Sequence, residues 1–141
     1  LKKLSVLIDQ YRNNGYAYNQ ICILTVKTEK ASFLNGVERI GNHSIKTTRG
    51  NSNVLFTTAR KFKGLEADAI IIIDIDADTF AEEDSKRLFY VGASRAKHFL
   101  DIIFIGGKQE LENVVSNISN KRYPTPFIGI ARSLNVKPIS N

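Results

Sequence analysis

The sequence predicts an α/β fold in which helices cover both faces of a parallel β-sheet. Runs of consecutive apolar residues, each about the length of a strand, alternate with segments whose apolar residues recur at helical spacing. Continuous apolar runs are typical of strands buried on both faces, and their alternation with helices favours parallel connections. The composition agrees, because 43% hydrophobic and 24% charged residues over 141 positions are ordinary for one globular domain.

Four segments have the pattern of helices. In the first, residues 1–14, Leu4, Leu7 and Ile8 share one face and Gly15 follows as a stop. A second helix is expected over residues 28–40, with Thr28 as its N-cap. Two further helices are expected over residues 81–98 and 108–119.

The apolar runs between these helices have the length of strands. Strands are expected over residues 21–26, 54–58, 69–75 and 100–105, with an edge strand over 44–48. Residues 1–120 then make up the domain. Residues 121–141 hold all three prolines and little periodicity, which predicts an irregular tail or packing arm.

Composition also bounds the setting of the protein. No apolar run approaches the length of a membrane span and no signal peptide opens the chain, so a cytoplasmic protein without membrane partners is expected. The single cysteine, Cys22, lies in an apolar run and is interpreted as a small core residue. The chain begins at Leu1 and has no methionine, which suggests a piece of something longer.

The net charge of +6 is unevenly distributed. Residues 1–63 carry eleven Lys and Arg against three Asp and Glu, whereas residues 64–120 carry five against eleven. A basic excess of this kind suits a phosphate-bearing partner, although a solvated basic face has the same composition.

Two motifs carry the functional signal. The segment TTARKFKGLEADAIIII runs from Thr57 to Ile73, and RLFYVGASRAK runs from Arg87 to Lys97. TARKFKGLE is similar to the fifth motif of UvrD/Rep-like superfamily 1 helicases, and RLFYVGASRA resembles the sixth. The resemblance covers roughly residues 21–104 and implies a second RecA-like motor domain, which has a parallel sheet with helices on both faces and no P-loop of its own.

The resemblance implies a role for each motif residue. In the fifth motif, Thr58, Arg60, Lys61 and Lys63 would form the face for single-stranded DNA. Arg60 stands where the family usually has histidine, so the positive charge is kept while a specific histidine contact is not.

The remaining motif residues would serve the nucleotide. Gly64 and Glu66 would approach ATP, with the glutamate at the ribose. Arg95 would be the catalytic arginine that reaches the γ-phosphate, and Arg87 a supporting position. In the family the fourth motif adds an arginine, but ILTVKTEKASFL has none, and Lys27 or Lys30 could only substitute as point charges.

No GxxxxGK[ST] motif is present in the chain. ATP and magnesium would therefore be held mainly by an N-terminal motor domain of the same polypeptide. The expected function is the C-terminal motor domain of an ATP-dependent DNA helicase or translocase, inactive as an ATPase by itself. The alternative is a RecA-like nucleic-acid-binding module that has lost motor activity.

Several other interpretations stay open at this stage. Arg95 could instead pair with a surface acid such as Glu82 or Asp84. The acidic run that begins at Asp74 could belong to a haloacid-dehalogenase-like phosphatase, but a solvated acidic loop is favoured. His43 and His98 have no spacing for a metal and are interpreted as surface or helix-end residues.

Overall fold

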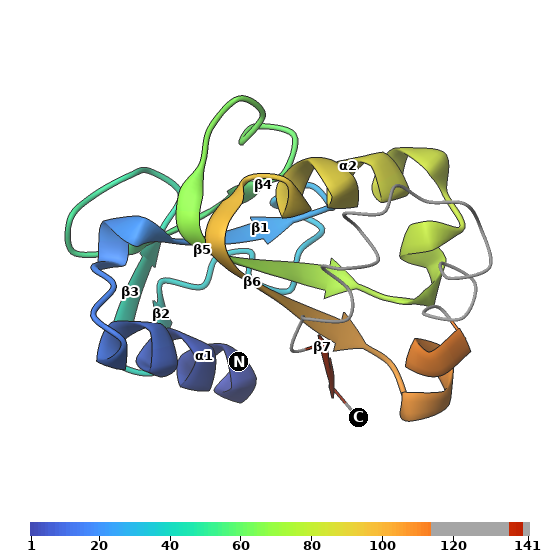
Figure 1. The fold of residues 1–141 in the computed structure, drawn as a ribbon, viewed down its shortest axis with the longest axis horizontal. Helices are drawn as coiled ribbons and strands as arrows, with labels where there is room; N and C mark the ends of the chain where they lie inside the picture. The colour runs from blue at the N-terminus through green and yellow to red at the C-terminus, as the bar shows by residue number, and fades with distance from the viewer. Residues whose placement is uncertain (114–135, 140–141) are drawn as a thin grey trace.

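A computed structural model of the chain describes residues 1–113 and 136–139. Its centre is a seven-stranded sheet in the order β2-β3-β4-β1-β5-β6-β7 (Figure 1). All neighbouring strands are parallel except β2 and β3, which are antiparallel. In chain order the elements are α1 (Lys2–Asn13), the short 3-10 helix η1 (Tyr18–Gln20), β1 (Ile21–Thr25), β2 (Arg39–Ile40), β3 (His43–Lys46), β4 (Val54–Thr58), β5 (Ala67–Ile75), the 3-10 helix η2 (Ala77–Phe80), α2 (Glu83–Ala93), β6 (Ala96–Ile105) and β7 (Val136–Ile139).

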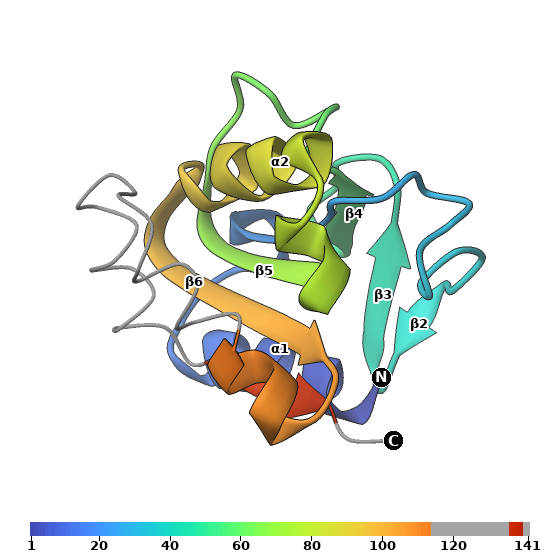
Figure 2. The ribbon, with the colours of Figure 1, turned by 90° about the vertical axis from the view of Figure 1, so that its right-hand side faces the viewer.

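Two apolar cores lie on opposite faces of the sheet, each under one helix. On one face, α1 packs Leu4, Leu7 and Ile8 against the sheet. On the other face, α2 contributes Phe89 and Ala93. Figures 1 and 2 show the two helices on either side of the strands. The predicted α/β fold with helices on both faces of a mostly parallel, RecA-like sheet is confirmed.

The central strands supply both cores because their side chains alternate. In β1, Ile21 and Ile23 face the α1 side, whereas Cys22 and Leu24 face the α2 side. β1 is therefore buried along its whole length and β5 at every residue except Asp68, which accounts for the continuous apolar runs in the sequence. Cys22 is a buried core residue, as predicted.

A glycine lets α2 approach the sheet closely. A Cβ added at Gly92 would lie 3.4 Å from the Cδ1 atoms of both Leu24 and Ile72. An interior helix glycine costs about 1 kcal/mol relative to alanine, so its presence needs a reason. The close helix-to-sheet contact supplies that reason.

The helix predicted over residues 28–40 is wrong. The structure has a chain of turns there, and only β2 at its end is regular. Local side-chain bonds favour the turns: the Thr28 hydroxyl accepts from the Ala31 amide at 3.2 Å, and the Ser32 hydroxyl accepts from the Leu34 amide at 3.2 Å. Such bonds compete with helical hydrogen bonding. Leu34 anchors the segment in the core, which explains the apolar residues that suggested a helix.

The helix predicted over residues 81–98 is too long. α2 ends at Ala93, and β6 begins at Ala96 in register with Ala67 of β5. Sheet pairing with β5 therefore overrides the helical periodicity of the last five residues. Arg95 lies in the turn between α2 and β6 rather than on the helix, so the predicted angle between Arg87 and Arg95 around a helix axis does not apply.

His43 is buried, so its interpretation as a surface or helix-end residue is wrong, whereas His98 is exposed, as interpreted. His43 is buried in β3, where its Nε2 lies 2.5 Å from Asp9 and its Nδ1 lies 2.8 Å from the Tyr18 hydroxyl. His98 is exposed but belongs to β6, next to Asp68 at 3.4 Å. His43 therefore ties α1 and η1 to β3.

The predicted boundary at residue 120 falls outside the described residues. Residues 108–113 are helical, and the rest of the closing helix expected over 108–119 lies beyond them. β7 runs parallel to β6 and pairs Ile102 with Val136. Within residues 1–113 and 136–139, no helix combines the length and apolar character needed to cross a membrane.

Candidate nucleotide and nucleic-acid site

The fifth-motif segment joins the edge of the sheet at which the parallel strands end to the opposite edge, at which they begin. β4 and β5 are both parallel to β1, so the carboxyl end of β4 and the amino end of β5 lie on opposite edges. Residues 59–66 cross from one edge to the other beside α2 (Figure 2), and Phe62 of this crossing is fully buried. The motif residues therefore divide into two groups, which we call the carboxyl edge (Thr58, Arg60, Lys61) and the amino edge (Glu66, Arg95).

The carboxyl edge borders a groove of about 640 Å³. The groove is lined by Thr58, Arg60 and Lys61 from the end of β4, by residues 26–30 after β1, and by the start of α2. The Arg60 side chain is exposed. Thr58 is mostly buried, and its hydroxyl accepts from the Lys61 amide at 3.0 Å, which fixes the turn that presents the two cations.

The walls of this groove carry both signs of charge. Lys61 Nζ lies 2.8 Å from Glu29 Oε1, and Lys27 Nζ lies 4.0 Å from Asp76 Oδ2. Glu82 and Asp84 line the side formed by α2. A phosphate-bearing ligand in the groove would have to compete with Glu29 for Lys61, whereas Arg60 has no ion pair within the described residues.

Asp74 is a structural residue of the same edge, so the prediction of a solvated acidic loop is wrong at this position. The Asp74 side chain is buried and its backbone has a φ of +64°. It accepts a hydrogen bond from the Thr25 hydroxyl at 2.6 Å and one from the Phe33 amide at 3.3 Å. A buried carboxylate that holds two segments explains why the strained backbone is tolerated.

Asp76, the next acid after Asp74, also has structural partners. Asp76 caps η2 by accepting from the Asp78 amide at 3.0 Å and the Thr79 amide at 3.1 Å. Among residues 1–113 and 136–139, no cluster of three His, Cys, Asp or Glu side chains could hold a metal ion. Asp74 and Asp76 thus take part in the hydrogen bonds that hold this loop.

The amino edge brings Glu66 and Arg95 together. The Ala67 amide donates to the Arg95 carbonyl at 3.1 Å, which places Glu66 and Arg95 beside each other at the start of β5 and β6. The Glu66 carboxylate is exposed and lies 3.5 Å from Lys97 Nζ. Arg95 Nε is buried and finds no hydrogen-bond partner within the described residues. A buried donor without a partner is costly unless a ligand or another domain supplies an acceptor.

Arg87 lies apart from this pair. It is exposed, and its Nη2 lies 3.3 Å from Asp84 Oδ1 one turn earlier on α2. The start of α2 lines the groove at the carboxyl edge, so Arg87 is not brought to Glu66 and Arg95. The ion pair considered for Arg95 is thus made by Arg87: in the part of the chain that the structure describes, Asp84 pairs with Arg87.

Lys63 and Gly64 lie within the crossing between the edges. Both are exposed, and Gly64 has a φ of +84° with open space around the position of a Cβ. Left-handed backbone rather than close packing therefore accounts for this glycine within the chain.

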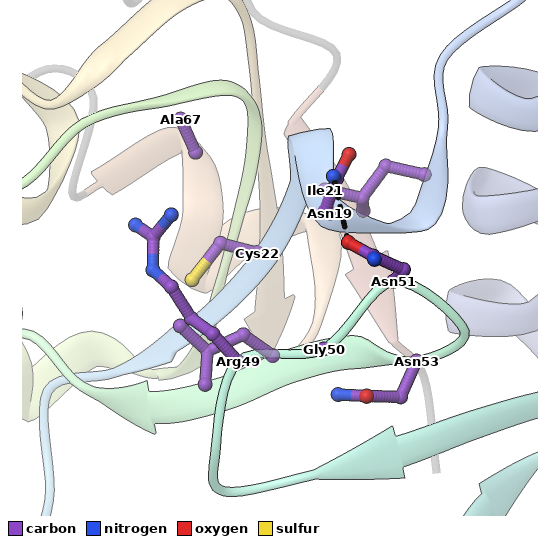
Figure 3. A pocket seen from close by; sticks show the side chains of 9 residues that line it. Asn19, Ile21, Cys22, Arg49, Gly50, Asn51, Asn53 and Ala67 are labelled. Carbon is purple, nitrogen blue, oxygen red and sulfur yellow. Dashed lines mark hydrogen bonds between the residues drawn. The ribbon is translucent and has the colours of Figure 1, made fainter.

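Sequence reasoning missed Arg49, which lies in the turn before β4. Its Nη2 donates to the Glu66 carbonyl at 3.4 Å, so a second guanidinium, besides that of Arg95, belongs to the amino edge. The guanidinium extends past Cys22 toward Ala67 in a pocket of about 410 Å³ (Figure 3). Only a single basic residue in a polar turn marks this position in the sequence, and no motif surrounds it.

The structure is thus an α/β domain in which the exposed turn with Arg60 and Lys61 and the turn with Arg95 lie at opposite edges of one mostly parallel sheet. Residues 53–103, about a third of the chain, match the model of the UvrD-like helicase C-terminal domain family. The match includes both motifs and confirms the predicted resemblance to the C-terminal domain of UvrD/Rep-like helicases. No curated protein matches the chain.

Proposed function

We propose that this chain acts as the C-terminal motor domain of an ATP-dependent DNA helicase or translocase. The observation that carries the proposal is the family match over residues 53–103, which contains both the carboxyl edge and the amino edge. The separation of these edges supports a division of roles: one edge for single-stranded DNA and the other for the nucleotide.

At the carboxyl edge, Arg60 and Lys61 are the residues that would contact the DNA backbone. Both are exposed on a turn that the Thr58 hydroxyl fixes. Arginine and lysine beside a phosphate chain give affinity without sequence preference, because the attraction is to the backbone. Lys63, exposed further along the same segment, would extend this surface.

At the amino edge, Glu66 and Arg95 would act on ATP. The exposed Glu66 carboxylate can accept hydrogen bonds from ribose hydroxyls. Arg95 would stabilise the charge that develops on the γ-phosphate during hydrolysis, as arginines supplied from a second domain do. Gly64 would lie near the nucleotide, and Arg87, which pairs with Asp84, would have at most a supporting role.

The phosphates and Mg²⁺ would be held mainly by an N-terminal motor domain of the same polypeptide. This follows from the sequence, which contains no P-loop motif. The described residues of this chain supply no acidic cluster for the metal either. By itself the chain should therefore release no phosphate from ATP.

The experiment that tests the proposal measures binding of a fluorescent single-stranded oligonucleotide to the chain by anisotropy at several salt concentrations. Affinity should fall with salt, and replacing Arg60 and Lys61 together by alanine should lower the slope of log K against log salt by about 1.4, since each neutralised phosphate contributes about 0.7. A variant with Lys2→Ala and Arg39→Ala removes the same charge elsewhere and should keep the slope. An equal loss in both variants would remove Arg60 and Lys61 from the DNA surface.

A further inference from the structure

The pocket that contains Arg49 lies at the amino ends of three parallel strands. Its apolar floor is formed by Cys22, Leu55 and Ala67 from β1, β4 and β5. Asn19 and Asn51 form part of the rim and are joined by a hydrogen bond of 3.3 Å (Figure 3). We call this the amino-edge pocket. An apolar floor with a few polar groups at the rim is typical of sites for small molecules.

Arg49 is the single charged residue among the described residues that line the amino-edge pocket. Burial raises the pKa of the Cys22 thiol, an effect that the positive charge of Arg49 only partly opposes, so Cys22 stays neutral. The described residues give Arg49 no carboxylate partner; its contacts are the Glu66 carbonyl at 3.4 Å and the Phe62 ring, 5.8 Å from its centroid. A guanidinium has five N–H donors, so most of them stay available to a ligand.

The turn that presents Arg49 is fixed by the protein before any ligand binds. The buried Asn53 side chain donates to the Thr48 carbonyl at 3.1 Å and to the Val54 carbonyl at 3.3 Å, which ties both ends of the turn. A Cβ at Gly50 would lie 2.3 Å from Asn53 Oδ1, so this close turn requires glycine. A pre-formed turn lowers the entropic cost of holding an arginine in place for a ligand.

We propose that the amino-edge pocket binds a phosphate group of a nucleotide, with Arg49 as its anchoring cation and the amides of Asn19 and Asn51 as hydrogen-bonding groups at the rim. The proposal rests on the proposed function, in which Glu66 and Arg95 act on ATP. Arg49 contacts the Glu66 carbonyl, and the amide of the adjacent Ala67 donates a hydrogen bond to the Arg95 carbonyl. An arginine fork matches phosphate oxygens in two-point geometry.

A nucleotide fits this pocket better than a DNA strand does. A DNA backbone needs cations along an open surface, and the carboxyl edge presents the neighbouring exposed cations Arg60 and Lys61. The amino-edge pocket is a hollow with a single cation, and its volume of about 410 Å³ suits one small ligand.

The test is a ¹H–¹⁵N NMR titration of the chain with ADP, with adenosine, with inorganic triphosphate and with a thymidine oligonucleotide. ADP should shift the amides of Gly50, Asn51 and Ala67 saturably, and triphosphate should compete with it. Adenosine should bind far more weakly because it has no phosphate. Arg49→Ala should weaken ADP binding about tenfold or more, and Arg49→Lys should restore little, since an ammonium lacks the fork.

Arg39→Ala, which removes an exposed arginine elsewhere, is the matched control and should bind ADP like the original chain. Circular dichroism melting establishes that each variant is folded. The proposal is overturned if ADP leaves the three amides unchanged, if folded Arg49→Ala binds ADP normally, if adenosine binds as well as ADP, or if the oligonucleotide shifts these amides in place of ADP. In the first three cases, salt-sensitive DNA binding that depends on Arg60 and Lys61 would leave the proposed function standing.

Discussion

The two edges of the sheet differ in how they hold their arginine and lysine side chains. At the carboxyl edge, the groove walls mix cations with acids, and Lys61 already has Glu29 as a partner at 2.8 Å. At the amino edge, Arg95 Nε is buried and lacks a partner within the described residues, and Arg49 is the single charged residue among the described residues that line its pocket. An open surface with exchangeable ion pairs suits a ligand that moves along it. Fixed and unsatisfied donors suit one oxyanion held in one geometry.

The largest effect should come from Arg95, in a longer protein that includes the first motor domain. If Arg95 stabilises charge on the γ-phosphate, Arg95→Ala should lower kcat for ATP hydrolysis about 10³-fold or more. Binding of DNA should stay nearly unchanged, and Arg95→Lys should rescue little because the fork is lost. Steady-state ATPase assays with melting temperatures on the same variants check this; a folded Arg95→Ala enzyme with normal kcat would contradict the assignment.

The second effect concerns Asp74, whose hydrogen bonds hold segments at the carboxyl edge and none at the amino edge. Asp74→Ala leaves the Thr25 hydroxyl and the Phe33 amide without their acceptor, and it should lower the free energy of unfolding by about 2 to 4 kcal/mol. Asp74→Asn should lose less, because asparagine keeps an acceptor and tolerates a positive φ. Urea unfolding gives both values. If alanine and asparagine were equally harmless, the two bonds would not hold residues 26–38 in place.

The smallest effect should come from Glu29, which competes with phosphate for Lys61. Glu29→Gln removes the ion pair and should raise affinity for single-stranded DNA about two- to fivefold at low salt, the range of an exposed pair. Glu38→Gln makes the same charge change at an exposed position without this pair and should alter affinity less. Anisotropy titrations compare the two; equal gains would mean that net charge, rather than release of Lys61, sets the affinity.

The centre of the sheet could be predicted from the sequence because β1 and most of β5 are nearly continuous apolar runs. The run from Ala69 to Ile75 fits a strand buried on both faces, and β5 extends only two residues further back. The end of α2 could not be predicted in the same way. Helical spacing continues past Ala93, and only the pairing of Ala96 with Ala67 in three dimensions converts the chain into a strand.

The site was predictable only where a motif marked it. Glu66 and Arg95, which the motifs predict to serve one nucleotide, lie beside each other, whereas Arg87 pairs with Asp84 near the other edge. Arg49 lies outside both motifs. It reaches Glu66 only because a hydrogen bond from Asn53 holds the turn in which Arg49 lies. Contacts of this kind depend on how loops fold back on the sheet, which periodicity does not encode.

In the proposed function, DNA and nucleotide use opposite edges of one sheet. Hydrogen–deuterium exchange of the chain with and without a thymidine oligonucleotide tests it most directly. We expect protection of residues 27–30 and 58–61 at the carboxyl edge, with no change at residues 49–51 and 66–67. Protection at the amino edge, or at both edges equally, would contradict it.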